Sequence, residues 1–112
     1  MKNDEYAAPA LSEILTDPTL PVYVSTITEA ELFSFSRLTK EETKWIEDFL
    51  GVISRVPVDS QIARAAGHIR SIYHLKLPDS IIAATTLFTG STLLTRNVSD
   101  FKKIPSFPTR PI

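Results

Sequence analysis

The stretch Leu77–Phe101, LPDSIIAATTLFTGSTLLTRNVSDF, contains a predicted helix followed by a predicted strand. Pro78 suits the first turn of a helix, where no backbone N–H is needed, and Asp79 places a negative charge at the positive end of the helix dipole. Gly90 can adopt the left-handed conformation that ends a helix. The apolar residues between them leave almost no polar face, which predicts a core helix buried on two sides: Ile81, Ile82, Ala83, Ala84, Leu87 and Phe88.

A short apolar run, Thr92–Thr95, follows Gly90 and has the length of a strand. Turn-forming residues come directly after it, at positions 96–100. A helix followed by a strand is half of a βαβ unit, and ligands of open parallel sheets bind at the carboxyl ends of the strands. We therefore expect Asn97 and Asp100 at the carboxyl edge of the predicted sheet. The N-terminus of the helix, which carries Asp79, can face the same edge.

The rest of the chain alternates between strands and helices in the same way. Three strands are predicted, at Val22–Ser25, Val56–Val58 and Ser91–Thr95, and the proline-rich tail could add a fourth. Helices are predicted over residues 4–15, over 28–35 with Thr28 as N-cap, from a capping box at Thr39, and over 62–73 with Asp59 or Ser60 as cap. This alternation predicts an α/β layer structure with a parallel sheet.

Composition narrows the class of protein. A chain of 112 residues is one domain, and 43% hydrophobic with 22% charged residues is ordinary for a soluble globular protein. No apolar run is long enough to cross a bilayer and no secretory signal is present, so we expect a cytoplasmic protein without membrane contact. No cysteine and only two histidines mean that any metal would be held by oxygen. The net charge of −1 gives no overall attraction to RNA, so any RNA contact would depend on a local cluster of basic residues. Lys102 and Lys103 are either such a contact with RNA phosphates or simply solvent-exposed charges.

Three carboxylates, Glu31, Asp79 and Asp100, each follow a predicted strand or begin a helix that can face the same edge. Carboxylates gathered at one edge repel one another unless a cation neutralises them, and oxygen ligands suit Mg²⁺ or Mn²⁺. Such a metal activates a bound water and stabilises the charge that develops on a phosphodiester under attack. Thr95 and Asn97 can orient water or a carboxylate there.

Each of these carboxylates also has a purely structural interpretation. Thr28 and Glu31 have the spacing of a capping box, Asp79 can simply stabilise a helix dipole, and Asp100 is a common turn residue. The metal site is therefore indicated by their joint placement and not by any one residue.

Three segments resemble the second, third and fourth acidic motifs of PIN domains: Thr28–Leu32 (TEAEL), Leu77–Ala84 (LPDSIIAA) and Leu94–Phe101 (LTRNVSDF). The likeness is strongest to VapC-type toxins of toxin–antitoxin pairs and covers about Val22 to Ile104. It implies a three-layer sandwich with a central, mostly parallel sheet flanked by helices. It also implies a Mg²⁺-dependent endoribonuclease that cleaves RNA, is inhibited by a cognate antitoxin covering the active-site groove, and often works as a homodimer.

The resemblance implies that Glu31, Asp79 and Asp100 are catalytic metal ligands, with Thr28, Thr95 and Asn97 assisting. PIN domains begin with an apolar strand that ends in an aspartate, and nothing before Val22 fits that pattern. We expect a single PIN-like domain shortened at its N-terminus, without this first strand and its aspartate. The strands that normally flank it can pair directly, another chain can donate a strand, or the fragment can be poorly stable and inactive; Asp4 is a weak candidate to replace the lost ligand.

These observations leave a ribonuclease and a binding module as the main hypotheses. The second is a catalytically reduced PIN remnant that binds an antitoxin or a second copy of itself through exposed apolar surface. A small nucleotide-binding α/β protein ranks last because the chain has only Gly51, Gly67 and Gly90 and no glycine-rich phosphate loop.

Overall fold

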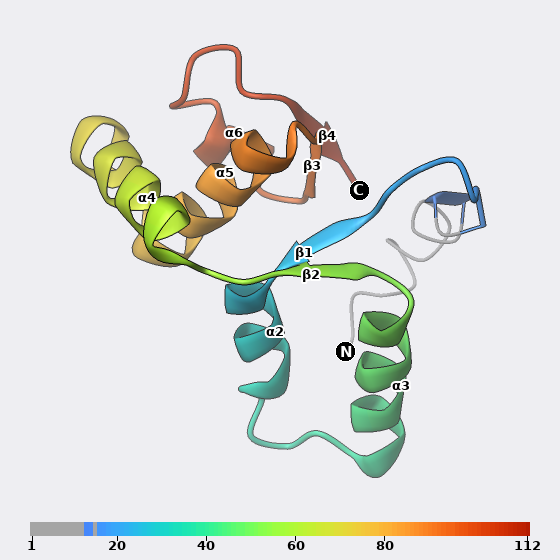
Figure 1. Cartoon of the computed structure of the whole chain (residues 1–112). Helices are drawn as coiled ribbons and strands as arrows, with labels where there is room; N and C mark the ends of the chain where they lie inside the picture. Colours follow the sequence, from blue (N-terminus) through green and yellow to red (C-terminus); the bar gives the residue numbers. More distant parts are fainter. Residues whose placement is uncertain (1–12, 15) are drawn as a thin grey trace. The chain divides into compact units, whose positions relative to one another are not determined.

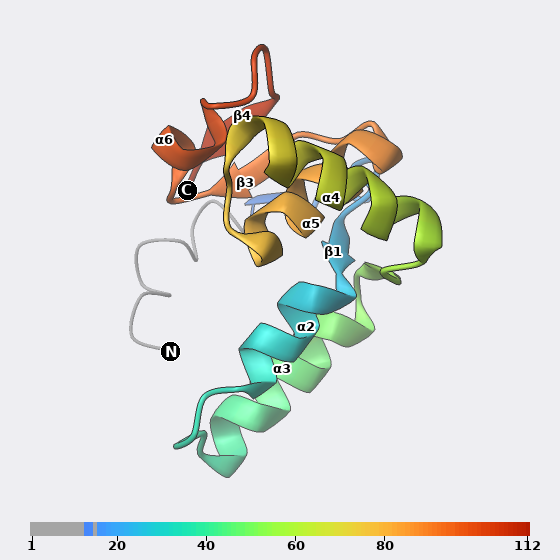
Figure 2. The same ribbon diagram turned by 90° about the vertical axis from the view of Figure 1, so that its left-hand side faces the viewer.

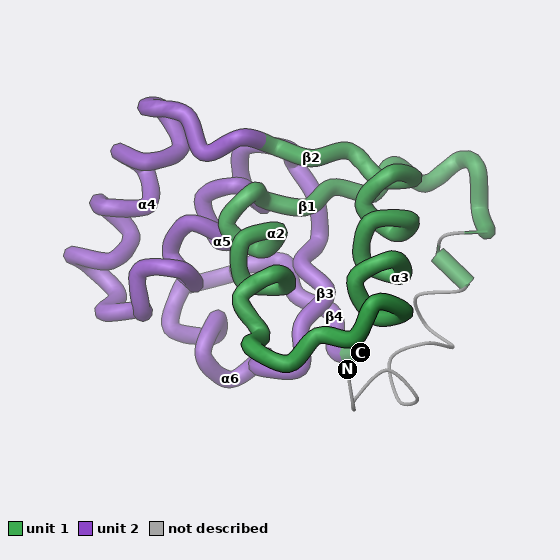
Figure 3. Tube along the Cα trace, turned by 90° about the horizontal axis from the view of Figure 1, so that it is seen from below, with its two compact units in different colours: residues 1–56, 112 green, residues 57–111 purple. Residues whose placement is uncertain are grey.

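The structure, a computed structural model, describes residues 13–14 and 16–112, and the chain divides into two compact units. Unit 1 contains residues 1–56 and Ile112, and unit 2 contains Pro57–Pro111 (Figure 3). Most of the predicted helix at residues 4–15 lies outside the described residues, and so does Asp4.

The described part of unit 1 contains a parallel strand pair and the helices α2 and α3 (Figure 1). Its elements are β1 (Tyr23–Ser25), α2 (Thr26–Phe33), α3 (Lys40–Gly51) and β2 (Ser54–Val56). In the pair, Tyr23 lies opposite Ser54 and Ser25 opposite Val56, and the Ser54 N–H donates to the Val22 carbonyl over 2.9 Å. The prediction of a strand at Val56–Val58 is wrong by two residues. Pairing ends at Val56 because Pro57 has no N–H to donate to a ladder.

The two helices of unit 1 begin at different kinds of cap. Thr39 and Glu42 form the predicted capping box, with the Glu42 N–H donating to Thr39 Oγ1 over 3.0 Å. The prediction of Thr28 as N-cap is wrong: Ser25 is the N-cap of α2, and its hydroxyl accepts from the Ile27 N–H over 3.2 Å. Ser25 ends β1, so the strand turns directly into the helix and Thr28 lies inside it.

Unit 2 contains two packed helices and a second parallel strand pair (Figures 1 and 2). Its elements are α4 (Ser60–Tyr73), α5 (Leu77–Thr89), β3 (Leu93–Thr95), α6 (Val98–Phe101) and β4 (Thr109–Pro111). Strand β4 is the fourth strand that the tail was expected to add, and Leu93 lies opposite Thr109 in the pair. Asp59 caps α4 as predicted, accepting from the Ile62 N–H over 2.9 Å.

Helix α5 begins at Leu77, one residue before Pro78, and ends as predicted at Gly90 in the left-handed conformation, with φ of 64°. Its buried residues are all small: Ser80, Ala83, Ala84, Thr85 and Thr86. Residues 83–86 are consecutive, so they lie on different sides of the helix, and the predicted burial on more than one side holds for its middle. The prediction is wrong for the last turn, where Leu87 is 52% and Phe88 54% exposed.

The turn between α4 and α5 is closed by local hydrogen bonds. His74 takes the left-handed conformation, with φ of 59°, and its N–H donates to the Arg70 carbonyl over 2.9 Å. The Arg70 guanidinium donates to the Leu75 carbonyl over 3.0 Å, and the Leu75 side chain is buried. These contacts fix where α5 begins relative to α4.

Among the described residues, the strands pair only as β1 with β2 and β3 with β4. Each pair lies within one unit, and the three outcomes expected for a shortened domain stay predictions. The α/β class with parallel strands flanked by helices is confirmed. None of the helices in residues 13–14 and 16–112 is long and apolar enough to cross a membrane.

We predict that Ile62→Ala lowers the free energy of unfolding by about 2–5 kcal/mol, because it leaves a cavity in a packed core. The Ile62 side chain is 1% exposed on the α4 face that also buries Ala66 and Ile69. The matched control is Ile72→Ala on the same helix, where the residue is 47% exposed and the loss should stay below about 1 kcal/mol. Urea denaturation measures both; equal losses would contradict the assignment of this core.

Candidate functional site

Asp79 lies in the first turn of α5 and is held there by its neighbours. Ser80, next to it, is fully buried, and its hydroxyl donates to the Lys76 carbonyl over 2.9 Å. Lys76 is the N-cap residue, with extended backbone and no side-chain cap. Asp79 itself is half-buried. Its carboxylate therefore projects from a helix start whose position is set by packing on one side and by the α4–α5 turn on the other.

Asp100 lies in the short helix α6, just past the carboxyl end of β3. The Thr95 hydroxyl at the end of β3 accepts from the Asn97 N–H over 3.0 Å, and the Asp100 N–H donates to the Asn97 carbonyl over 3.1 Å. Phe101 is 2% exposed and stacks on Phe107, with ring centroids 5.6 Å apart. These contacts fix the turn that carries Asp100, which is half-buried.

The two aspartates are close enough to repel each other. Burial raises the pKa of Asp79, repulsion by Asp100 raises it further, and the Lys76 ammonium opposes both effects. Lys76 stands only three residues before Asp79, but no local signal in the sequence marks it as part of a site. The structure thus brings together two of the predicted carboxylates in unit 2, with the Lys76 ammonium acting on Asp79.

The donor chemistry of this pair suits a hard divalent cation. Mg²⁺ in proteins is often held by one or two carboxylates, with waters and substrate phosphates completing its coordination. Within residues 13–14 and 16–112, no group of three His, Cys, Asp or Glu side chains is placed to hold a metal ion. Asp79 and Asp100 fit a site in which the protein supplies two carboxylates, and a cation between them would relieve their repulsion.

Glu31 lies in unit 1, on the exposed side of α2. Because the N-cap of α2 is Ser25, Glu31 is inside the helix and does not form a capping box with Thr28, which removes the structural alternative given by their spacing. Its carbonyl accepts from both the N–H and the hydroxyl of Ser34. The roles of Glu31 and of the half-buried Thr28 at a metal site stay predictions.

Thr95 and Asn97 differ in what their side chains do. The Thr95 hydroxyl is engaged with the Asn97 N–H, so it shapes the turn before α6. The Asn97 side chain is exposed and makes no cap hydrogen bond to α6, although Asn97 occupies the N-cap position. An exposed amide beside Asp100 can orient water or substrate, and this role of Asn97 stays a prediction.

Comparison with known proteins adds a family and a set of similar structures. The sequence model of the PIN domain family matches residues 2–106. The fold is similar to VapBC2 from Rickettsia felis bound to promoter DNA, with a TM-score of 0.78 and 19% identity over 99% of this chain and 88% of that one. It is also similar to a toxin–antitoxin complex from Klebsiella pneumoniae (TM-score 0.73, 27% identity, 97% and 92% coverage). VapBC-1 from nontypeable Haemophilus influenzae is a further match (TM-score 0.73, 23% identity, 96% and 84% coverage). No curated protein matches the chain.

We predict that Asp100→Asn lowers the pKa of Asp79 in the metal-free protein, because it removes a neighbouring negative charge. Carboxyl-detected NMR titration in EDTA measures this shift. Asp17 is the internal control: the Thr19 hydroxyl and N–H lower its pKa through hydrogen bonds of 2.6 and 2.9 Å, and Asp100→Asn should leave it unchanged.

The same titration has a consequence for stability. The pKa of Asp79 is raised in the folded protein, so its contribution to stability is fully present below the unfolded-state pKa and is lost as the pH rises through the folded value. In the NMR titration, an Asp79 pKa that Asp100→Asn leaves unchanged would show that the two carboxylates do not form one site.

Proposed function

Because the chain belongs to the PIN domain family and its fold matches VapBC toxin–antitoxin structures, we propose that it is a VapC-type toxin acting as a Mg²⁺-dependent endoribonuclease in the cytoplasm. Mn²⁺ is the alternative metal, since it accepts the same oxygen ligands. The observation that carries the proposal is the proximity of two aspartates: Asp79 lies at the start of α5, and Asp100 lies just past the end of β3.

In this proposal the chain's own residues bind and orient. Asp79 and Asp100 supply carboxylate oxygens, Glu31 is the proposed third carboxylate, and Asn97 and Thr95 orient groups around them, with Thr28 supporting Glu31. When bound, the metal supplies an activated water and neutralises charge on the phosphodiester. In the net hydrolysis, oxygen from water bonds to phosphorus and the bond from phosphorus to a ribose oxygen breaks.

The partners proposed for this activity are an RNA substrate, a cognate antitoxin and a second copy of the chain. The antitoxin is supported by the neighbours, since the matched structures from Rickettsia felis, Klebsiella pneumoniae and Haemophilus influenzae are toxin–antitoxin assemblies. A metal site shared by repelling carboxylates also offers a simple means of inhibition, because a cationic side chain of a partner protein can occupy the place of the metal.

We predict that the purified chain cleaves RNA when Mg²⁺ is added and that EDTA abolishes cleavage. Asp79→Asn and Asp100→Asn should each reduce the rate about a hundredfold or more, the scale on which loss of one positioned electrostatic group costs activity. Glu47→Gln, an exposed carboxylate change on α3, is the control and should keep full activity. Full activity of Asp79→Asn would exclude this residue from the reaction.

The binding module remains the second candidate, because apolar surface is exposed in both units. Phe35 is 61% exposed in unit 1, and in unit 2 an open groove of about 240 Å³ lies between α4 and α5, with Leu87 and Phe88 among its lining residues. Surfaces of this kind often bind other proteins. A catalytically reduced PIN remnant would use them to bind an antitoxin or a second copy of the chain.

For self-association we predict that sedimentation analysis finds twice the mass of one chain and that Phe88→Ser shifts the equilibrium to monomer. Phe35→Ser is the matched control, since it removes the same ring from an exposed position in unit 1. A folded monomer at all concentrations would reject self-association, and a stronger effect of Phe35→Ser would move the interface to unit 1.

A further inference from the structure

Charge is distributed very unevenly along the chain. Residues 57–111 contain seven Lys and Arg and three Asp and Glu, whereas residues 1–56 contain five Lys and Arg and ten Asp and Glu. The net charge of −1 therefore hides a cationic unit 2 and an anionic unit 1. The basic residues of unit 2 are Arg64, Arg70, Lys76, Arg96, Lys102, Lys103 and Arg110.

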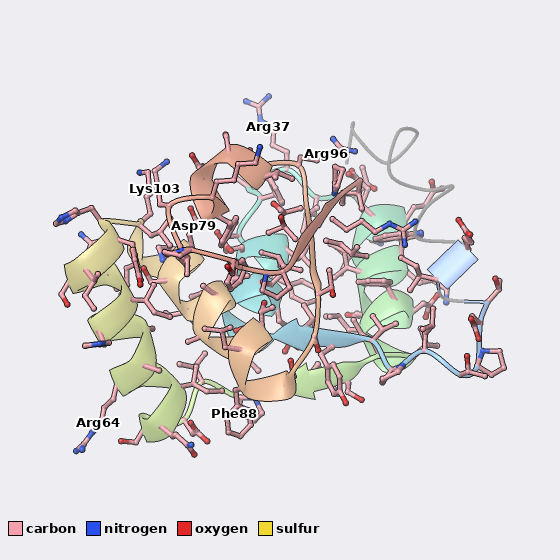
Figure 4. The ribbon with its side chains drawn as sticks, turned by 90° about the horizontal axis from the view of Figure 1, so that it is seen from above. Arg37, Arg64, Asp79, Phe88, Arg96 and Lys103 are labelled. Atoms are coloured by element: carbon pink, nitrogen blue, oxygen red, sulfur yellow. The ribbon has the colours of Figure 1, made fainter. Side chains whose placement is uncertain are left out.

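Three of these cations adjoin the aspartate pair. Lys76 is the N-cap of α5 and acts electrostatically on Asp79. Lys102 is the C-cap of α6 and Lys103 follows it; the Lys102 N–H donates to the Val98 carbonyl and the Lys103 N–H to the Asp100 carbonyl. In the view of Figure 4, Lys103 is drawn beside Asp79, and Arg64 and Phe88 lie toward the other end of the α4–α5 pair.

All three lysines are exposed, and among the described residues none of them forms an ion pair. The ion pairs of Lys44 with Asp48 and of Arg55 with Glu29 both belong to unit 1. Exposed cations next to a carboxylate pair have no evident role in folding. They suit a polyanion whose reacting phosphate lies at the carboxylates and whose neighbouring phosphates need compensation.

We propose that Lys76, Lys102 and Lys103 form a phosphate track on unit 2 that binds the backbone of single-stranded RNA on either side of Asp79 and Asp100. The inference rests on the proposed function for the identity of the polyanion. Lysine acts here as a point charge on a flexible stem, which contacts phosphates without reading sequence. The track therefore sets affinity and placement of the strand, and leaves any sequence preference to other residues.

The test is the salt dependence of binding of a fluorescently labelled single-stranded oligoribonucleotide, measured by anisotropy in EDTA so that no turnover occurs. Each phosphate contact to a single strand contributes about 0.7 to the slope of log K against log salt. The triple change Lys76→Gln, Lys102→Gln and Lys103→Gln should therefore reduce the slope by about 2. The corresponding triple Lys→Arg variant should keep the parental slope.

The matched control removes the same charge from unit 1, by Arg37→Gln, Lys40→Gln and Lys44→Gln, all at exposed positions. An unchanged slope in this control supports a local track. Equal reductions in both triples would show an effect of net charge alone and would overturn the proposal, as would an unchanged slope in the unit 2 triple or a parental chain that binds no RNA.

Cleavage in Mg²⁺ separates this inference from the proposed function. If the parental chain fails to cleave RNA while the slope falls only in the unit 2 triple, the phosphate track stands and the nuclease is rejected. If the parental chain cleaves RNA and the unit 2 triple binds with the parental slope, the nuclease stands and the track is rejected.

Discussion

The packing of α5 against α4 through small side chains is the constraint on which the candidate site depends. Ala83 and Ala84 on α5 and Ala66 on α4 are almost fully buried, so the backbones of the two helices can approach closely. The Arg70 guanidinium closes the turn between them by donating to the Leu75 carbonyl. A carboxylate on the first turn of a helix fixed in this way has little freedom to move away from a neighbouring charge.

That lack of freedom explains the electrostatics of Asp79. A helix N-terminus favours the charged form of a carboxylate, yet burial and the nearby Asp100 raise the pKa of Asp79. Burial and repulsion therefore outweigh the helix dipole and the attraction of Lys76. The proposal that this pair binds a cation accounts for two carboxylates held together in this way, and oxygen donors suit Mg²⁺ or Mn²⁺.

Local signals in the sequence predicted much of the fold. Pro78 and Gly90 bound α5 to within a residue, and the Thr39–Glu42 capping box is present, because these features depend only on neighbouring backbone. The wrong predictions concern tertiary contacts, which a local sequence pattern does not indicate. Ser25 takes the place of Thr28 as the cap because β1 runs straight into α2, and Leu87 and Phe88 in the last turn of α5 stay exposed because they line the open groove between α4 and α5.

The candidate site, too, contains residues that local sequence signals predict and residues that they do not. Asp79 and Asp100 meet because one helix start and one strand end in unit 2 carry them, which the helix-then-strand order of Leu77–Phe101 predicts. Glu31 belongs to unit 1, so its place at a metal site depends on the arrangement of parts that no local spacing encodes. Lys76 was missed because a lysine before a helix resembles any solvated end until the aspartate beside it is known to be half-buried.

The strand pairs add a reason why the site and the stability of unit 2 are linked. β3 and β4 are three residues each, and an isolated parallel pair of that length is not stable in water. Their order must come from packing around them, where Phe101 and Ile104 are buried and Phe101 stacks on Phe107. The same residues hold the turn that carries Asp100. Loosening this cluster therefore releases the strand pair and one of the two carboxylates together, so the geometry of the pair exists only while the core beneath it is packed.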